Sequence, residues 1–152
     1  MDKTALKNLL STWAEGLEFD EEQQELQITV PVGEIHQFAK QLKDNKDTAF
    51  DYLFCQTGLD WPAHLEVIYH LESTVHGHIV VLKVNTEGRE TPAIDTVCDI
   101  WATAEFHERE IFDLYGIVFN NHPDLRRILL TDDWEGYPMR KDYVDEVNIV
   151  SS

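Results

Sequence analysis

The spacing of hydrophobic residues changes several times along this chain of 152 residues. Leucines and one tryptophan recur every three or four positions over residues 4–13, which predicts an amphipathic helix. Residues 15–24 form an acidic link, and residues 26–30 alternate between hydrophobic and polar, which predicts a strand. Helical spacing returns over residues 35–43, so we expect a second helix there.

Three further strands are predicted in the middle of the chain. The first covers residues 52–57 and is expected to end at Gly58. The second covers residues 64–71, with hydrophobic residues at alternate positions. The third covers residues 79–84, and its continuous hydrophobic run is typical of a central strand that is buried on both faces. A turn around Gly77 would join the last two strands as a hairpin.

Helical patterns return after the strands. Residues 93–98 are expected to form a short helix, and residues 101–115 the strongest helix of the chain, which Gly116 would end. The order of the elements indicates an α+β fold, with helices packed on a mixed, mostly antiparallel sheet. We expect an α+β domain over residues 1–119 and an extended C-terminal tail over residues 120–152.

The charge of the chain narrows its possible partners. Twelve Lys and Arg residues stand against 29 Asp and Glu residues, a formal net charge of −17. Such a field repels phosphate backbones and anionic lipids, so no nucleic acid is expected and membrane contact would go through another protein. No stretch approaches the roughly 20 apolar residues that span a bilayer, and no secretory signal is recognised. Cys55 and Cys98 are expected to be buried thiols, although a disulfide stays open.

A carboxylate interrupts the hydrophobic face of the strongest predicted helix. Glu108 falls in the middle of the face that is formed by Trp101, Ala104, Ile111, Phe112 and Tyr115. A carboxylate in such a face needs a partner, so we expect Glu108 to belong to a structural ion pair. Arg126 and Arg127 are the nearest candidates by sequence. Arg109 lies beside Glu108 and can pair with Glu105 and Asp113, which stand four positions before and after it on the helix. The alternative is a general acid with a raised pKa.

Motifs for catalysis or cofactor binding are missing. His107 and Glu108 begin like a zinc-protease helix, but Ile111 stands where the second histidine is required. The chain has no glycine-rich nucleotide loop and no nucleophile elbow, and its two cysteines are too few for an iron–sulfur cluster. His76 and His78 are interpreted as solvated turn residues. We therefore expect no catalytic residue, no cofactor and no metal in this chain.

The C-terminal part of the chain concentrates residue types that favour interfaces. Four of the five arginines lie between residues 105 and 143, together with tryptophan and tyrosine. The predicted partner interface consists of Arg126, Arg127, Trp134, Arg140, Lys141 and Tyr143. The alternative, a tail that folds back on its own domain, stays open.

The same region resembles a known family. The residues that carry the resemblance are Glu108-Arg109-Glu110, Asp113, Gly116-Ile117, Phe119, His122, Pro123-Asp124-Leu125-Arg126-Arg127-Ile128-Leu129, Asp132-Asp133-Trp134, Gly136, Pro138, Arg140-Lys141-Asp142-Tyr143 and, earlier, Gly58, Asp60 and Trp61. They resemble the signature of the 30-kilodalton subunit family, the C subunit of the proton-pumping NADH–quinone oxidoreductase, respiratory complex I. Met139 and Val144 depart from the family, which often has Leu and Pro there.

The resemblance implies a non-catalytic subunit without cofactors in the hydrophilic arm of that complex. It would contact the D and B subunits and other hydrophilic-arm subunits on the cytoplasmic face of the bacterial inner membrane. Electrons would pass from NADH through FMN and iron–sulfur clusters in those partners to quinone. Two alternatives stay open: an equivalent subunit of an energy-converting hydrogenase, formate hydrogenlyase or ferredoxin-linked complex, and a free-standing acid–base enzyme that uses Glu108 with His107 or His122.

Overall fold

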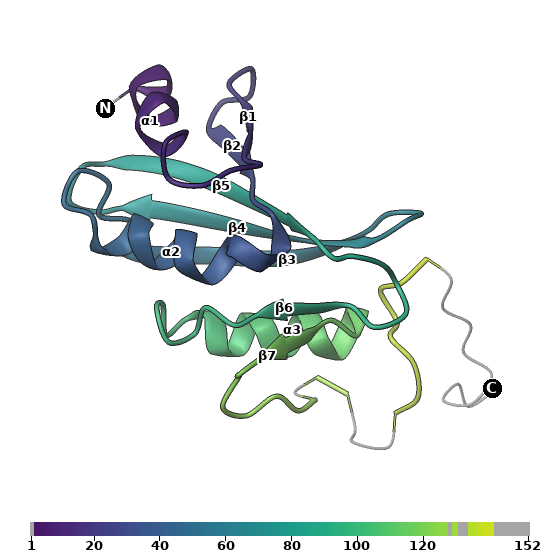
Figure 1. The fold of residues 1–152 in the computed structure, drawn as a ribbon. Coiled ribbons are helices and arrows are strands. Elements are labelled where there is room, and N and C mark those ends of the chain that lie inside the picture. The colour runs from purple at the N-terminus through teal and green to yellow at the C-terminus, as the bar shows by residue number, and fades with distance from the viewer. Residues whose placement is uncertain (1, 128, 131–133, 142–152) are drawn as a thin grey trace.

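A five-stranded mixed sheet with the strand order β1-β2-β5-β4-β3 forms the centre of the protein (Figure 1). The computed structural model describes residues 2–127, 129–130 and 134–141. The strands of this sheet are β1 (Glu18–Asp20), β2 (Leu26–Thr29), β3 (Tyr52–Asp60), β4 (Leu65–Ser73) and β5 (His78–Asn85). All neighbours are antiparallel except β2 and β5, which are parallel. The predicted α+β fold is thereby confirmed.

Helices pack on one face of this sheet. They are α1 (Lys3–Leu10), α2 (Ile35–Asp44), which follows the 3-10 turn η1 (Val32–Glu34), and α3 (Ala104–Tyr115). Asp2 begins α1, because its carboxylate accepts a hydrogen bond of 2.8 Å from the amide of Ala5. Gly116 ends α3 as predicted, since its φ of +78° is a left-handed conformation that glycine adopts without strain.

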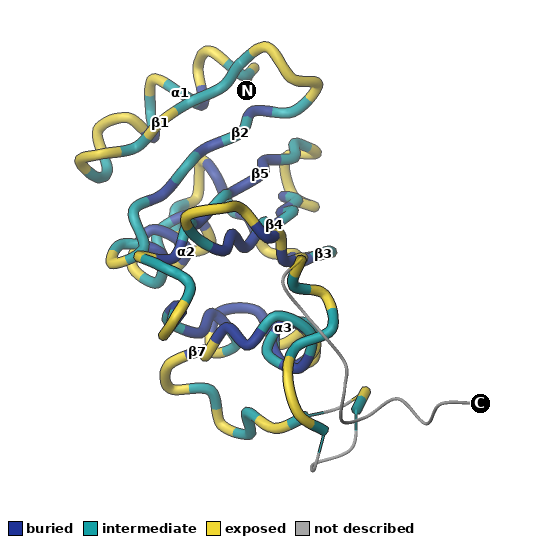
Figure 2. The backbone as a smooth tube through the Cα atoms, turned by 90° about the vertical axis from the view of Figure 1, so that its right-hand side faces the viewer, coloured by how far each residue is buried: buried dark blue, intermediate teal, exposed yellow. Residues whose placement is uncertain are grey.

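One continuous core lies between the sheet and the helices. Alternate residues of β3, β4 and β5, such as Leu53, Val67 and Leu82, meet the hydrophobic sides of α2 and α3. Figure 2 shows these buried segments along the central strands and along α3. Residues on the opposite face of β4, including Ile68 and His70, are only half-buried, so that face of the sheet has no comparable cover among the described residues.

Strand β3 does not end at Gly58, contrary to our prediction. Gly58 pairs with Val67 of β4, and the strand continues to Asp60. A Cβ atom at Gly58 would lie 2.7 Å from the ring of Tyr115. The glycine is therefore required by the close approach of α3, and it does not interrupt the strand.

Two short strands also differ from the sequence-based expectation. Residues 93–98 were predicted as a helix, but they contain β6 (Ala93–Asp95), which pairs in parallel with β7 (Val118–Asn120) in a separate two-stranded sheet. Strand β1 lies inside the region expected to be an acidic link. Three-residue strands depend on their tertiary partners, so their own sequences carry little periodic signal.

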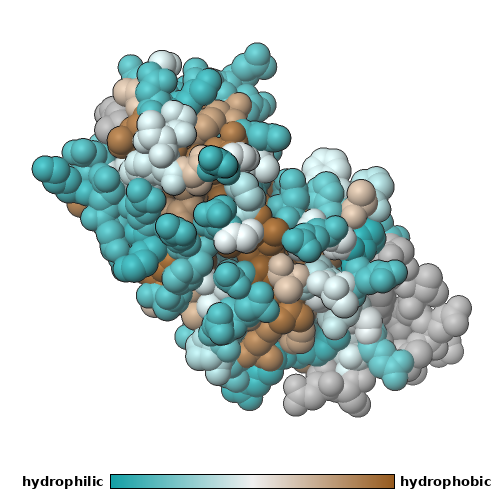
Figure 3. All heavy atoms as spheres, viewed as in Figure 1, coloured by the Kyte–Doolittle hydropathy of each residue, from teal (hydrophilic) through white to brown (hydrophobic). Residues whose placement is uncertain are grey.

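The surface reflects the composition of the chain. Hydrophilic residues cover most of the face seen in Figure 3, and a hydrophobic band crosses its middle. Among the described residues, no helix has both the length and the apolar character that crossing a membrane requires.

Candidate functional site: helix α3 and the C-terminal segment

Glu108 of α3 is fully buried and is bound by three uncharged donors. The hydroxyl of Thr96 and the amide of Val97 donate to it, the latter at 3.1 Å, and the side chain of Gln56 donates at 3.3 Å. Burial raises the pKa of Glu108 to about 7, because the interior penalises the charged form more than these hydrogen bonds stabilise it. Thr96 follows β6 and Gln56 lies in β3, so the carboxyl group joins α3 to both sheets.

The expected ion pair of Glu108 is wrong. No arginine pairs with its carboxyl group among the described residues; Arg126 pairs with Asp124 instead, at 3.0 Å. Arg109 points elsewhere, because neighbouring helical residues do not face each other. The Arg109 side chain donates to the carbonyl oxygen of Arg126 at 3.3 Å and lies over the ring of Phe106.

The buried ion pair of α3 joins Asp113 to Arg127. The guanidinium of Arg127 donates to the carboxylate of Asp113 at 2.9 Å, and the side chains are 11% and 0% exposed. The amides of Leu129 and Leu130 also donate to Asp113, at 2.7 and 2.9 Å. A carboxylate near the C-terminus of a helix opposes the helix dipole, so these donors offset an otherwise unfavourable charge. The acidic group that Arg127 meets therefore belongs to its own chain.

Residues 134–141, which we call the C-terminal segment, close the end of α3. The amide of Met139 donates to the carbonyl oxygen of Leu114 at 3.0 Å, and the side chain of Arg140 donates to that of Tyr115 at 2.6 Å. These carbonyl groups belong to the last turn of the helix and have no partner within it. The ring of Tyr137 packs on Gly116, where a Cβ atom would lie 2.6 Å away.

Two arginines hold the ring of Tyr137 in place. Arg127 and Arg140 lie 5.1 and 5.2 Å from its centroid, within the range of cation–π attraction. Arg127 also donates to the carbonyl oxygen of Gly136 at 2.9 Å. The arginine-rich region is therefore used, in part, to fix the C-terminal segment on its own domain.

The far end of the C-terminal segment is bound to the end of β3. The amide of Lys141 donates to the carboxylate of Asp60 at 2.6 Å, and Arg89 pairs with the same carboxylate. Hydrogen bonding by Arg89 lowers the pKa of Asp60 from its ordinary value. Sequence reasoning did not identify Asp60 and Arg89 as a pair, because 29 positions separate them.

The remaining residues of the predicted partner interface differ in exposure. The side chain of Arg126 is 68% exposed and pairs with Asp124 at the surface. Trp134 is half-buried, and Lys141 is exposed. Tyr143 lies outside the described residues. Contact of this set with another subunit stays a prediction.

Cys98, Glu108 and His122 form the strongest candidate for a metal site in the described part of the chain, with ligand atoms within 4.8 Å of one another. Glu108 and His122 already use their ligand atoms in hydrogen bonds. One ring nitrogen of His122 is bonded to the carbonyl oxygen of Glu105 at 3.0 Å, and the other accepts from the amide of Asp124 at 3.0 Å. Burial raises the pKa of the Cys98 thiol from its ordinary value. These local hydrogen bonds compete with a metal ion, and the absence of a metal in this chain stays a prediction.

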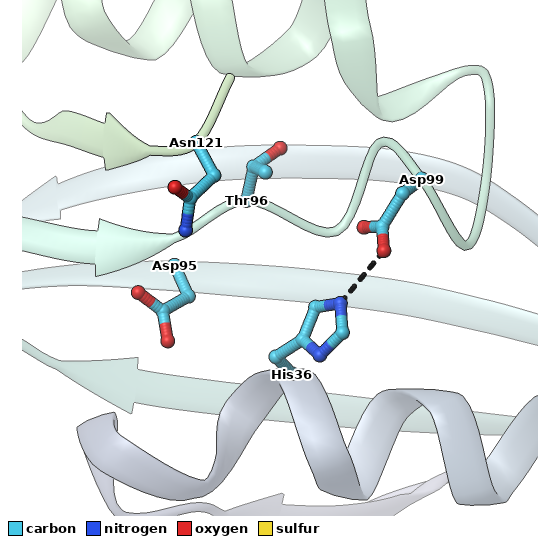
Figure 4. Close-up of a pocket in the computed structure, with 5 residues that line it drawn as sticks. All are labelled: His36, Asp95, Thr96, Asp99 and Asn121. Atoms are coloured by element: carbon cyan, nitrogen blue, oxygen red, sulfur yellow. Dashed lines mark hydrogen bonds and ion pairs between the residues drawn. The ribbon is translucent and has the colours of Figure 1, made fainter. Parts of the chain in front are cut away.

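A polar hollow lies between α2 and the β6–β7 sheet (Figure 4). His36 of α2 pairs with Asp99 across it at 2.8 Å, and Asp95, Thr96 and Asn121 complete its lining. The His36 and Asp99 side chains are 39% and 59% exposed, so the pair contributes less than about 1 kcal/mol. The hydroxyl of Thr96 donates its hydrogen bond to Glu108. It therefore does not donate to His36, which would be needed for His36 to activate it as a nucleophile.

The geometry thus defines a class of protein. It is a small acidic α+β protein whose buried carboxyl groups, Glu108 and Asp113, are bound by groups of its own chain and whose C-terminal segment is fixed on the last turn of one helix.

Comparison with known proteins identifies the family. The family described as "Respiratory-chain NADH dehydrogenase, 30 Kd subunit" matches residues 28–147. The C subunit of the NADH-quinone oxidoreductase of Chloroherpeton thalassium is 47% identical over 109 residues, which are 70% of this chain and 45% of that protein. The combined C/D subunit of the Phocaeicola vulgatus NADH-quinone oxidoreductase is 45% identical over 122 residues, which are 80% of this chain and 23% of that protein.

A solved structure agrees with these matches. It is that of the membrane-bound sulfane sulfur reductase, an archaeal respiratory membrane complex, and one of its chains superposes with a TM-score of 0.79 at 26% identity. The match covers 93% of this chain and 85% of that one. The chain belongs to the 30-kilodalton subunit family of respiratory-chain NADH dehydrogenase, as the sequence resemblance indicated. It spans about a quarter of the length of the C/D proteins that it matches.

Proposed function

We propose that this chain is a non-catalytic subunit of the peripheral arm of a proton-translocating NADH–quinone oxidoreductase. In this role it binds the neighbouring D and B subunits and supports electron transfer from NADH to quinone, which proceeds through FMN and iron–sulfur clusters in other subunits. Its contact with the cytoplasmic face of the bacterial inner membrane would be made through the assembled complex.

The observation that carries the proposal is the family match over residues 28–147, together with relatives that are named as the C subunit. The Phocaeicola vulgatus relative is named as a combined C/D subunit, and two subunits in one polypeptide support the D subunit as a neighbour. Segments fused in one chain stay close together at high effective concentration.

The arrangement of polar groups also supports a role without chemistry. Glu108 accepts hydrogen bonds from three donors inside the core, and Asp113 is paired with Arg127. His122 uses both ring nitrogens in local hydrogen bonds. Groups held in this way position the backbone, and none of them is directed at a cavity that a substrate could enter. This disfavours a free-standing acid–base enzyme.

Co-purification from native membranes tests the proposal. A tagged chain is expected to bring down the D and B subunits from solubilised membranes, in a particle that oxidises NADH with quinone. Purified alone, the chain is expected to oxidise no NADH. Recovery of the chain without any respiratory subunit would contradict the proposal.

A matched pair of variants tests the predicted interface. Arg126→Ala removes an exposed cation and is expected to weaken assembly. Lys40→Ala removes a cation of similar exposure, 63% against 68%, from α2 and should leave assembly unchanged. Equal recovery of the complex with both variants would count against Arg126 as an interface residue.

A second candidate keeps the architecture and changes the electron donor. The superposition with a chain of the archaeal sulfane sulfur reductase structure favours it. That similarity indicates that subunits of this fold occur in respiratory complexes that catalyse different reactions. The chain would belong to an energy-converting complex that uses hydrogen, formate or ferredoxin. The two candidates are distinguished by the co-purified subunits: NADH- and flavin-binding subunits favour the first, and hydrogenase subunits favour the second.

A further inference from the structure

Strand β3, an edge strand of the main sheet, exposes an unusual set of side chains. The described residues include nine exposed large hydrophobic side chains, and four of them lie in β3 or directly after it. They are Tyr52 (46% exposed), Phe54 (38%), Leu59 (38%) and Trp61 (45%). Edge strands usually carry charges that prevent pairing with other chains, so a hydrophobic edge indicates an interaction surface.

Tyr52, Phe54 and Leu59 lie on the sheet face away from the core, because the register of β3 against β4 shifts between Leu53 and Cys55 and turns Phe54 to the same face as Leu59. The rings of Tyr52 and Phe54 lie 6.0 Å apart, and the ring of Phe54 lies 5.7 Å from that of His70 in β4. The register of the sheet places Tyr52 beside Glu72 and Leu59 beside Glu66. The result is a hydrophobic strip with Glu72 and Glu66 of β4 beside its two ends and His70 and Ile68 between them.

The backbone edge of β3 is open over the same length. Its two ends are closed: the hydroxyl of Thr103 donates to the carbonyl oxygen of Leu53 at 2.8 Å, and the amide of Lys141 donates to the side chain of Asp60. Between them, over residues 54–59, no backbone group from the described part of the chain pairs with this edge. Unpaired backbone groups of this kind are a template for an additional strand.

A groove runs beside the open edge. It is lined by Thr57 and Gly58 of β3, by Ile111 and Leu114 of α3 and by the exposed side chain of Met139. A strand added to β3 would point alternate side chains toward this groove and toward the outer hydrophobic strip, because side chains alternate between the two faces of a sheet.

Charge decides which occupant the surface favours. Glu72 lies beside one end of the strip and the exposed Glu110 lies at the groove, whereas Glu66 is only 7% exposed and accepts a hydrogen bond from Trp61. A second copy of this chain, also at −17, would be repelled. Residues 142–152 carry three acidic residues and no Lys or Arg, so they are repelled as well.

We propose that an extended, basic segment of another protein adds to the open edge of β3 as a sixth strand of the sheet. Its apolar side chains would alternate between the groove and the strip of Tyr52, Phe54 and Leu59, and its Lys or Arg side chains would meet Glu72 and Glu110. This mode of binding obtains affinity from main-chain hydrogen bonds and specificity from alternate side chains. The inference rests on the proposed function, since the segment would belong to another subunit of the same assembly.

Photo-cross-linking in native membranes identifies the occupant. Benzoylphenylalanine in place of Tyr52 is expected to cross-link a peptide of another polypeptide that is rich in Lys or Arg and alternates with apolar residues. The same probe in place of Val75, a 70% exposed residue of the β4–β5 turn, is the control and should not give this product. A product with a second copy, or with residues 142–152, would overturn the inference.

Hydrogen exchange distinguishes an added strand from side-chain contact alone. In the purified complex, the amides of residues 54–59 are expected to exchange at least about tenfold more slowly than in the isolated chain. Strand β1, at the opposite edge of the sheet, serves as the internal control. Unchanged exchange over residues 54–59 in a complex that contains this chain would refute the added strand.

A substitution tests the energetic role of the strip. Leu59→Lys places a cation against the basic segment and is expected to lower the recovery of the complex at least about tenfold, as expected for disruption of an interface hot spot. Val75→Lys should leave recovery unchanged. Recovery of the chain with proteins outside the respiratory complex would overturn the proposed function, whereas protection of β3 by those proteins would still support the added strand.

Discussion

Replacing Glu108 by Gln should change the pH dependence of stability in a direction that reveals how the carboxyl group is held. Glu108 is fully buried against Thr96, Val97 and Gln56, and its pKa in the folded protein is about 7, compared with an ordinary value of 4.5. The folded state therefore binds the proton more tightly than the unfolded state. Stability from this group is fully present below pH 4.5 and is lost as the pH rises toward 7.

The magnitude follows from the two pKa values. Their difference is equivalent to a total loss of about 3 kcal/mol in the free energy of unfolding, of which about 2 kcal/mol falls between about pH 5.5 and pH 8. Gln has nearly the same shape and no titrating proton. The free energy of unfolding of the Glu108→Gln variant, relative to the native chain, should therefore rise by about 2 kcal/mol over that interval.

Urea denaturation followed by tryptophan fluorescence, at half-unit steps across that pH interval, measures this difference. Glu110→Gln, on the exposed side of the same helix, is the matched control and should show no such trend. An ion pair with an arginine would lower the pKa of Glu108 below its ordinary value of 4.5, so the carboxylate would stay ionised over the whole interval and the difference would be flat. A flat or falling difference would therefore refute the hydrogen-bonded, uncharged arrangement of the buried carboxyl group.

Three further substitutions have defined outcomes in urea denaturation at neutral pH. Arg127→Ala leaves the buried Asp113 without its cation and should lower the free energy of unfolding by about 3–5 kcal/mol; a loss below about 1 kcal/mol would contradict a buried pair. Arg126→Ala, at an exposed pair, should change it by less than about 1 kcal/mol, and a larger loss would show an internal role. Gly58→Ala forces a methyl group against Tyr115 and should cost about 1–3 kcal/mol, whereas unchanged stability would mean that α3 can move away.

The longer elements of the fold could be predicted from the sequence because their periodicity is strong. Helix α2 and strands β4 and β5 lie where the spacing of hydrophobic residues indicated. Strands β1, β6 and β7 were missed, since each has three residues and is stabilised by its pairing partner. Gly58 misled the prediction of β3, because a glycine demanded by a neighbouring helix looks the same in sequence as a glycine that breaks a strand.

The sequence showed which side chains belong to the site, but it did not show which groups bind one another there. The helical wheel correctly placed Glu108 on the buried side of α3. It could not show which elements cover that side, and the partners Thr96 and Gln56 are 12 and 52 positions away. An arginine partner was expected for Glu108 because a buried charge needs a counter-ion. A buried carboxyl group whose pKa is raised can instead stay protonated and therefore uncharged. Asp113 was the carboxylate that needed the cation.

The closed end of α3 sets an order for folding on the ribosome. Met139 and Arg140 bind carbonyl groups of Leu114 and Tyr115, which can be capped only after the helix has formed. The amide of Lys141 binds Asp60, which requires a finished strand 81 positions earlier. Because the N-terminal parts of a chain leave the ribosome first, the sheet and helix α3 can form before the C-terminal segment is synthesised. A chain truncated before residue 134 should therefore fold its sheet and leave the C-terminal end of α3 uncapped and frayed.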